Sequence, residues 1–328
     1  MNTLLEISNL KMSIAQKNKT IPILDGINFQ IDKGQVVAIV GESGSGKSMT
    51  ALSIMKLLPE PGGKIVEGNI VFNNVDLTEL SEDEMCSIRG KDISMIFQEP
   101  MTSLNPVLTI GEQISEVITY HQKISQSEAI KKSIELLKNV GISRAEEIIG
   151  DYPHRLSGGM RQRVMIAIAM SCNPKLIIAD EPTTALDVTI QVQILQLLRS
   201  LVKEYNTSVI IITHDLGVVS EIAEKVYVMY AGQIVEEATV EEIFDKPFHP
   251  YTIGLINSIP RITGELKRLE PIRGNVPMAG QIKQGCRFAP RCNKAFKDCF
   301  EKQPTMKRLT PTRSVRCFLY DHAEEYVE

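Results

Sequence analysis

An eight-residue glycine-rich segment constrains the fold of this 328-residue chain more than any other feature. Gly41–Ser48 reads GESGSGKS and matches the pattern G-x-x-x-x-G-K-[ST]. It follows the apolar run QVVAIV at 35–40 and leads into SMTALSIMKLLP at 48–59, whose apolar residues recur at helical spacing. The pattern predicts a buried strand, a phosphate-binding loop and a helix, an arrangement that directs backbone N–H groups at phosphate oxygens.

The eight residues of this loop are predicted to bind a nucleotide such as ATP. The loop residues are Gly41, Glu42, Ser43, Gly44, Ser45, Gly46, Lys47 and Ser48. The glycines allow the backbone to curl around the β-phosphate, and Lys47 reaches the β- and γ-phosphates. Ser48 is predicted to ligate Mg²⁺ through its hydroxyl oxygen.

The alternation of strand and helix recurs further along the chain. LIIAD at 176–180 precedes a helical segment, and so does SVIIIT at 208–213. Alternating buried strands and helices predict an α/β fold with a mostly parallel sheet covered on both faces. The patterns between about 97 and 171 are helical and predict a helical subdomain, whereas 225–238 predicts a closing hairpin.

The last quarter of the chain has a different composition. Eight of the sixteen prolines follow residue 246, which predicts a domain over 1–245 and a loop-rich extension over 246–328. No apolar run approaches the roughly 18 residues that a membrane-spanning helix needs, and the first residues carry no basic leader, so neither secretion nor membrane insertion is expected. A net charge of −4 gives no basic footprint for nucleic acid.

Three polar residues follow the predicted strands where α/β sheets place their ligands. Asp180 is the last residue of the predicted strand at 176–180 and Glu181 follows it. His214 directly follows the predicted strand at 208–213. Asp180 is suited to holding Mg²⁺, and Glu181 to orienting or deprotonating an attacking water. We expect His214 to contact the γ-phosphate.

The segment LSGGMRQR at 156–163 is the feature that indicates the class of protein. Together with the phosphate loop, Asp180–Glu181, TALD at 184–187 and His214, it resembles the nucleotide-binding domain of an ABC transporter. The resemblance implies a P-loop NTPase fold with a mostly parallel core, an antiparallel β part and a helical subdomain, followed here by a small cysteine-containing extension.

The resemblance also implies that the site is completed by a second domain. Ser157, Gly158, Gly159 and Asp187 would serve ATP held by the phosphate loop of a facing domain, so that two domains close head to tail over two nucleotides. Ser157 is also a typical N-cap for the helix that follows it. Gln98, in MIFQEP, occupies the position of the family's Q-loop and would join the Mg²⁺ site to a membrane subunit.

Three longer segments indicate a particular group within this family. EPMTSLNPVLTIGEQI at 99–114, HPYTIGLINSIPR at 249–261 and the cysteine-bearing segment resemble the D-type ATP-binding subunit of bacterial oligopeptide and dipeptide importers, in the peptide/nickel/opine group. This implies an F-type ATPase partner, two permeases, an extracytoplasmic solute-binding protein and a peripheral location on the cytoplasmic side of the cell membrane. A nickel-chelate or opine importer is the alternative, and a soluble ABC ATPase is a distant one.

The family usually stacks adenine on an aromatic ring near the N-terminus, but residues 1–28 contain no Phe, Tyr or Trp. Ile14 lies near that position. We therefore expect apolar contact without ring stacking, and weaker discrimination between bases.

Four cysteines lie in the extension. They are Cys286, Cys292, Cys299 and Cys317. Their spacing is longer than in structural zinc sites and favours an iron–sulfur cluster, [4Fe-4S], with zinc or packing thiols as the alternatives. Residues 283–316 carry ten Lys and Arg against two acids, a balance expected to offset an anionic cluster. Cys86 and Cys172 are isolated and predicted to be packing residues.

Overall fold

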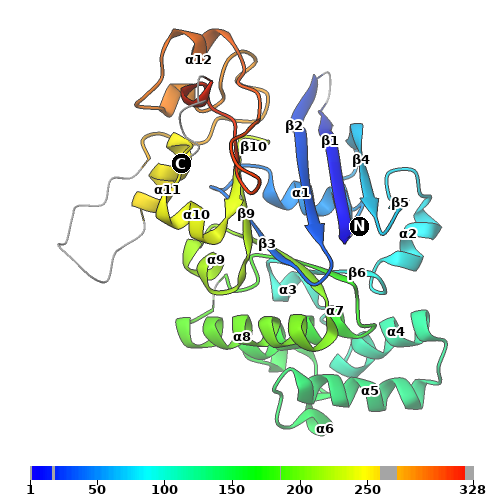
Figure 1. Ribbon diagram of the computed structural model, residues 1–328. Helices are drawn as coiled ribbons and strands as arrows, with labels where there is room; N and C mark the ends of the chain where they lie inside the picture. Colours follow the sequence, from blue (N-terminus) through cyan, green and yellow to red (C-terminus); the bar gives the residue numbers. More distant parts are fainter. Residues whose placement is uncertain (1, 17–18, 185, 259–271, 322–328) are drawn as a thin grey trace. The chain divides into compact units, whose positions relative to one another are not determined.

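The computed structural model describes residues 2–16, 19–184, 186–258 and 272–321 of the chain (Figure 1). These form two compact units. Unit 1 comprises residues 1–2, 32–36 and 79–212, and unit 2 comprises 3–31, 37–78 and 213–328. Each unit is described separately below.

Unit 1 is built on three parallel strands. They are β6 (Ile93–Ile96), β7 (Leu176–Asp180) and β8 (Ser208–Thr213), with Leu176 aligned to Ile93 on one side and to Ser208 on the other. Every residue of β7 and β8 is buried, as expected for strands covered on both faces. The strands predicted at 176–180 and 208–213 are therefore confirmed.

The rest of unit 1 is helical. Its helices are α2 (Glu82–Ile88), α3 (Pro100–Ser103), α4 (Ile110–Gln122), α5 (Gln126–Asn139), α6 (Ala145–Ile148), a 3₁₀ turn (Pro153–Arg155), α7 (Gly158–Met170) and α8 (Val188–Tyr205). Helices α4 and α5 lie side by side (Figure 1). Each begins at a capping box, Thr109 with Glu112 and Ser125 with Glu128, which fixes where the helix starts. The predicted helical subdomain is present.

Unit 2 contains two sheets. The first is antiparallel in the order β2-β1-β4-β5, and its strands are β1 (Thr3–Gln16), β2 (Lys19–Asp32), β4 (Gly63–Phe72) and β5 (Val75–Asp76). In the second, β3 (Val36–Val40) runs parallel to β9 (Lys225–Tyr230), β9 pairs antiparallel with β10 (Gln233–Thr239), and β12 (Ser314–Val315) joins β10 to β11 (Lys307–Arg308). The predicted hairpin is β9–β10.

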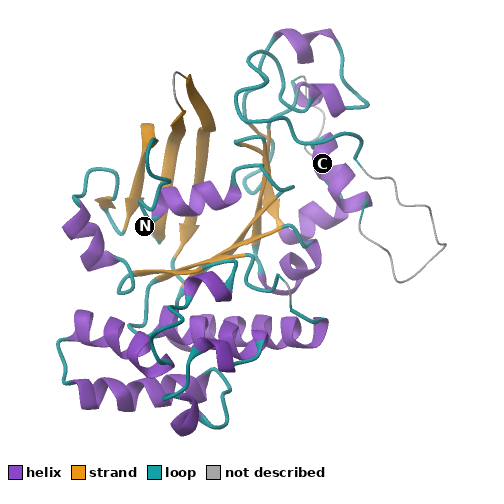
Figure 2. Ribbon diagram, turned by 180° about the vertical axis from the view of Figure 1, so that it is seen from behind, coloured by secondary structure: helices purple, strands orange, loops and turns teal. Residues whose placement is uncertain are grey.

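The helices of unit 2 are shorter. They are α1 (Lys47–Ile54), α9 (Leu216–Ile222), α10 (Val240–Asp245), α11 (Pro250–Asn257) and α12 (Lys297–Glu301), with 3₁₀ turns at Ala289–Arg291 and Phe318–Tyr320. Among the described residues after α11, loops predominate (Figure 2). The chain from α11 onward shares its apolar core with the second sheet, because Tyr251 of α11 and Phe288 pack around Tyr230 of β9. The boundary proposed near residue 245 stays a prediction.

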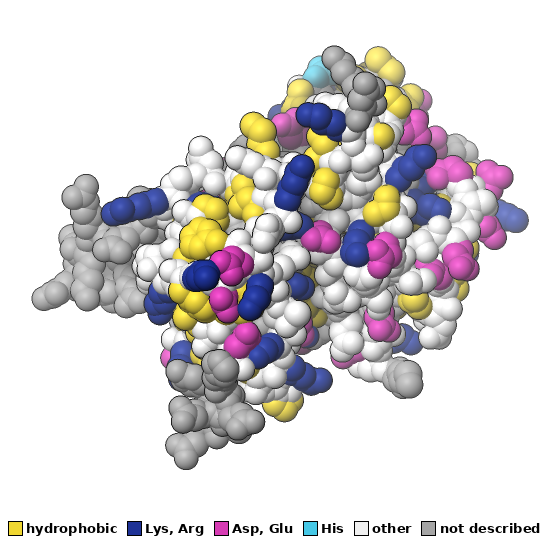
Figure 3. All heavy atoms as spheres, turned by 90° about the horizontal axis from the view of Figure 1, so that it is seen from above, with side chains coloured by type: hydrophobic (Ala, Val, Ile, Leu, Met, Phe, Trp, Pro, Cys, Tyr) yellow, Lys and Arg dark blue, Asp and Glu magenta, His cyan; other side chains and the backbone are white. Residues whose placement is uncertain are grey.

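Within the described ranges, no helix combines the length and apolar character required to cross a membrane. On the face seen in Figure 3, Lys and Arg side chains are interspersed with Asp and Glu side chains. The expectation that nucleic acid is not a partner stays a prediction.

Candidate functional site

The phosphate loop joins β3 to α1 with backbone angles that require glycine. Gly44 has φ +79° and Gly46 has φ +106°, in the left-handed region that L side chains rarely adopt. Space is limiting as well, because a Cβ added to Gly41 would lie 2.3 Å from the carbonyl oxygen of Met229. Around Gly44, in contrast, no atom of the described residues other than those of Gly44 and its two chain neighbours lies within 4 Å of an added Cβ. The loop is thus packed against the backbone of Met229 at Gly41, whereas the space beside Gly44 is not filled by the described residues.

Two polar side chains of the loop point to an anionic ligand. The Lys47 side chain is buried, and its Nζ donates to the carbonyl oxygens of Gly41 (2.8 Å) and Glu42 (3.1 Å). The Ser45 hydroxyl is fully buried and finds no hydrogen-bond partner among the described residues. A buried hydroxyl without a partner is costly, and a phosphate oxygen would supply one. Ser48, in the first turn of α1, offers the hard oxygen that Mg²⁺ prefers.

The loop also has partners that sequence reasoning missed. The backbone N–H of Glu42 donates to the Tyr251 hydroxyl (2.8 Å), and Arg291 pairs with the Glu42 carboxylate (2.6 Å). Glu42 and Arg291 are 249 positions apart, and no spacing pattern in the sequence relates residues so distant.

In unit 1, the structure brings Gln98 and Glu181 together. The Gln98 amide Nε2 donates to Glu181 Oε2 (2.9 Å), and the Thr184 hydroxyl donates to the same oxygen (2.8 Å). Glu181 has φ +46°, an unfavourable angle for a non-glycine residue that is often found at functional sites. Asp180, immediately before it, is buried at the end of β7. The carboxylate of Glu181 is therefore oriented by two donors, of which Thr184 was not predicted.

The signature segment and the start of α8 also meet in unit 1. The Ser157 hydroxyl accepts the N–H of Met160 (3.3 Å) and caps α7, which confirms the predicted N-cap. Asp187 caps α8 by accepting the N–H of Ile190 (3.0 Å). A Cβ added to Gly159 would lie 3.0 Å from Ile190 Cγ2, so these two helix starts are packed closely. The proposed roles of Ser157, Gly158, Gly159 and Asp187 toward a nucleotide stay predictions.

Two further predicted residues lie in unit 2. His214 is exposed and directly follows the last residue of β8, as expected. Ile14 lies on β1 opposite Gly63 and is half-buried. Their contacts with nucleotide stay predictions. Ala185 of the segment 184–187 and residues 259–261 of the segment 249–261 lie outside the described residues.

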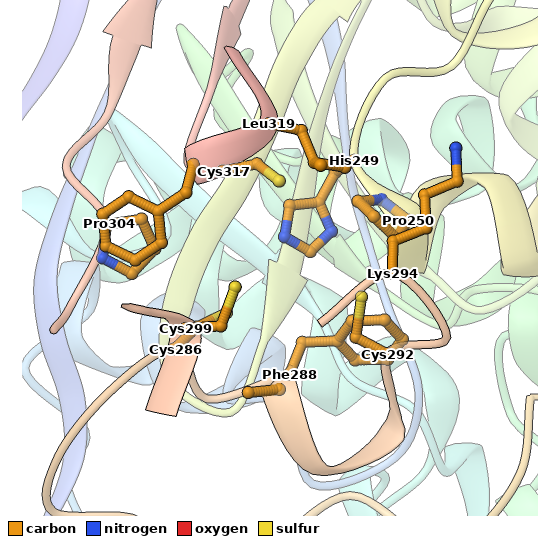
Figure 4. A pocket seen from close by; sticks show the side chains of 12 residues that line it. His249, Pro250, Cys286, Phe288, Cys292, Lys294, Cys299, Pro304, Cys317 and Leu319 are labelled. Atoms are coloured by element: carbon orange, nitrogen blue, oxygen red, sulfur yellow. The ribbon is translucent and has the colours of Figure 1, made fainter. Parts of the chain in front are cut away.

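The prediction of an iron–sulfur cluster is wrong. Figure 4 shows Cys286, Cys292, Cys299 and Cys317 lining one cavity with His249. In the part of the chain that the structure describes, however, no three His, Cys, Asp or Glu side chains are grouped closely enough to hold a metal ion. The zinc alternative fails for the same reason. Burial raises the pKa of Cys286 and Cys292, and raises that of Cys317 to about 12, so the neutral thiol is favoured over the thiolate that binds metal.

The contacts of the basic residues in the extension explain why their excess did not indicate an anionic cluster. Arg287 pairs with Asp25, and Arg291 pairs with Glu42. Arg313 donates to the carbonyl oxygens of Lys246 (2.7 Å) and Glu242 (2.5 Å). These cations stabilise the fold through acids and carbonyls elsewhere in the sequence, so their excess within 283–316 indicates no anionic cluster.

Comparison with known proteins places this geometry in a family. Residues 24–184 match the model described as "ABC transporter", and residues 235–299 match "Oligopeptide/dipeptide transporter, C-terminal region". The chain is 60% identical to the oligopeptide transport ATP-binding protein AppD of Bacillus subtilis, over 98% of each chain. The chain belongs to the oligopeptide and dipeptide group of ABC transporter ATP-binding proteins. It is therefore an ABC-type ATPase, and the family implies binding of ATP and Mg²⁺.

Other relatives of this ABC ATPase agree. It is 52% identical to the oligopeptide transport protein OppD of Bacillus subtilis, over 96% of this chain and 88% of the relative. It is 47% identical to the dipeptide transport protein DppD of the same organism, over 99% and 97%. Among solved structures, a dimeric ATP-binding cassette in a post-hydrolysis state with ADP and Pi matches with a TM-score of 0.65 and 31% identity, over 72% of this chain and 99% of that one. The P-loop ABC fold predicted from the sequence is confirmed.

Proposed function

We propose that this chain hydrolyses ATP to power the import of oligopeptides or dipeptides across the cell membrane. The observation that carries the proposal is whole-length similarity to peptide-transport ATP-binding proteins, which includes a match to their C-terminal region as well as to the ATPase domain. A nickel-chelate or opine importer would share the ATPase domain, but the relatives named above are peptide transport proteins.

In the proposed reaction, the phosphate loop binds the nucleotide. The N–H groups of the loop and the Lys47 ammonium would contact the β- and γ-phosphates, where the buried Ser45 hydroxyl also gains a partner. Ser48, Asp180 and Gln98 would hold Mg²⁺, which neutralises charge on the phosphates. The carboxylate and hydroxyl oxygens among these groups fit this hard cation.

Glu181 is the proposed general base. Its carboxylate is held by Gln98 and Thr184, so it needs little reorganisation to orient a water molecule and accept its proton. His214, exposed after β8, would donate a hydrogen bond to the γ-phosphate. The capped start of α7, with Ser157 exposed and Gly158 and Gly159 behind it, would contact the nucleotide of a facing domain together with Asp187.

The proposed partners are a related F-type ATPase subunit, two permeases and an extracytoplasmic solute-binding protein. The chain would lie peripherally on the cytoplasmic side of the cell membrane. Three apolar side chains within nine positions of Gln98 in the sequence are exposed, Phe97 by 38%, Met101 by 60% and Val107 by 75%, which supports a protein contact in this segment.

The proposal is tested by affinity purification of the tagged chain from detergent-solubilised membranes of its host. We expect a second ATPase and two permeases to copurify. After reconstitution of this complex in liposomes, ATP hydrolysis should increase when a peptide-loaded binding protein is added. The same complex carrying Glu181→Gln is the control and should show no increase. Stimulation by a nickel chelate but by no peptide would contradict the proposed substrate.

A further inference from the structure

The C-terminal extension contacts the phosphate loop directly. Arg291 forms two hydrogen bonds with the Glu42 carboxylate, Nη1 to Oε2 (2.6 Å) and Nη2 to Oε1 (3.0 Å). On the same loop residue, the backbone N–H donates to the hydroxyl of Tyr251 (2.8 Å), which lies in α11. Both the side chain and the backbone of Glu42 are therefore held by residues more than 200 positions later in the sequence.

The arginine of this ion pair is buried, whereas the Glu42 side chain is 32% exposed. The Arg291 side chain is only 5% exposed. Its guanidinium lies 5.7 Å from the ring centre of Tyr230 and 6.0 Å from that of Phe288, and it also donates to the carbonyl oxygen of Gly274 (3.1 Å). A two-pronged pair in such a setting is directional and weakly screened by salt. Removing Glu42 would leave the buried charge of Arg291 without its carboxylate partner.

A second contact supports the loop at Ser45. Arg287, also in the extension, pairs with Asp25 and donates to the carbonyl oxygen of Ala231. The next residue, Gly232, donates its N–H to the carbonyl oxygen of Ser45 (2.7 Å). Gly232 has φ +80°, and a Cβ there would lie 2.1 Å from the carbonyl oxygen of Ile23, so the backbone is closely packed at this turn and glycine is required. The extension thus supports the loop at two points.

The supported residues are those on which phosphate binding depends. Lys47 Nζ hydrogen-bonds to the carbonyl oxygens of Gly41 and Glu42, so a displacement of Glu42 would also displace an acceptor of the lysine. A loop that is already shaped for its ligand binds it more tightly, because less ordering is required on binding. Support from the extension would therefore increase nucleotide affinity.

We propose that the C-terminal extension holds the phosphate loop in its nucleotide-binding shape, with Arg291 as the principal positioning residue. This rests on the proposed binding of ATP by the loop. Coupling between two sites is reciprocal, so bound nucleotide must in turn stabilise the extension. The extension would then link nucleotide occupancy to any partner that contacts this part of the chain.

The first test measures the Kd of MgATP for the full-length chain by fluorescence titration or calorimetry. We expect Arg291→Met to raise the Kd about tenfold, within the usual range of coupling between sites. Arg313→Met is the matched control, because Arg313 is equally buried, lies in the same extension and donates to the carbonyl oxygens of Lys246 and Glu242. Its Kd should stay near the wild-type value. Equal weakening by both variants, or an unchanged Kd for Arg291→Met, would overturn the proposal.

A double-mutant cycle separates loop positioning from general destabilisation. Glu42→Gln should weaken MgATP binding as Arg291→Met does, and the double variant should be no weaker than the single ones. Arg291→Lys, which retains the charge but not the two-pronged geometry, should recover part of the affinity. Additive losses in the double variant would show that the two side chains act independently.

The wild-type chain provides a test that needs no folded Arg291 variant. MgATP should slow amide hydrogen exchange in residues 285–300, and Lys47→Ala should abolish that protection. ATP binding without protection of this segment would refute the coupling and leave the proposed function intact. Failure of the wild-type chain to bind ATP would instead contradict the proposed function itself.

Discussion

Stability should fall on mild acidification because of one buried histidine. His249 is 1% exposed, and its Nδ1 accepts the N–H of Tyr251 (3.1 Å) at the start of α11. Burial, with a smaller contribution from Arg316, lowers the pKa of His249 to about 3. The ring is therefore neutral in the folded chain throughout the physiological range.

The sign and the magnitude of this change in stability follow from the difference between the pKa of His249 in the folded chain and its pKa in the unfolded chain. An unfolded histidine has a pKa of about 6.5, so between about pH 3 and 6.5 the unfolded chain binds one proton more than the folded chain. The contribution of His249 to the free energy of unfolding thus decreases as the pH falls. From pH 7.5 to 5.5 the loss attributable to His249 is about 1.4 kcal/mol. For a chain of 328 residues this lowers the Tm by about 2 °C.

The assay compares thermal unfolding of wild type and His249→Asn at pH 7.5 and pH 5.5. Asparagine does not titrate and can replace the cap at the start of α11. Burial raises the pKa of neighbouring Glu236, which gives stability the opposite pH dependence, but this contribution is common to both proteins and cancels in the comparison. Between pH 7.5 and pH 5.5, the Tm of the variant should fall by about 2 °C less than the Tm of wild type. Identical pH dependence of the two proteins would refute the reasoning.

Two further predictions concern the nucleotide site. Glu181→Gln should lower steady-state ATP hydrolysis about 10²- to 10⁴-fold while MgATP binding is retained, because the general base is lost but the phosphate loop is intact; unchanged turnover would exclude this role. If Ile14 takes the proposed position at the base, where it offers no aromatic ring for stacking, ATP and GTP should bind with affinities within a few-fold of each other in a filter-binding assay, and a strong preference for ATP would count against that assignment.

The parts of the fold that are encoded locally could be predicted from the sequence. The strands at 176–180 and 208–213 are continuous apolar runs, and buried parallel strands have that pattern. The cap at Ser157 and the glycines of the phosphate loop are also local, because each depends on backbone geometry within a few residues. These predictions needed no knowledge of tertiary structure.

The interactions between distant segments could not be predicted in this way. The pairing of Arg291 with Glu42 has no signature in the spacing of either residue. The prediction of an iron–sulfur cluster was wrong for a related reason. The spacing of the cysteines along the chain does not show whether their thiols converge on one point or line a cavity. Thr184 was close to the predicted site in sequence, but no residue pattern indicated that its hydroxyl donates to Glu181.

The distance in sequence between Glu42 and Arg291 has a consequence for synthesis of the chain. During translation, Glu42 is incorporated 249 residues before Arg291. At about 5–20 residues per second, the ion pair is delayed by at least roughly 12–50 seconds after the loop has been made. Throughout that interval the nascent chain carries a complete glycine-rich motif without Arg291, and for most of it without Tyr251 as well. A ribosome-bound fragment and the finished protein therefore differ at this loop although their motif sequence is the same.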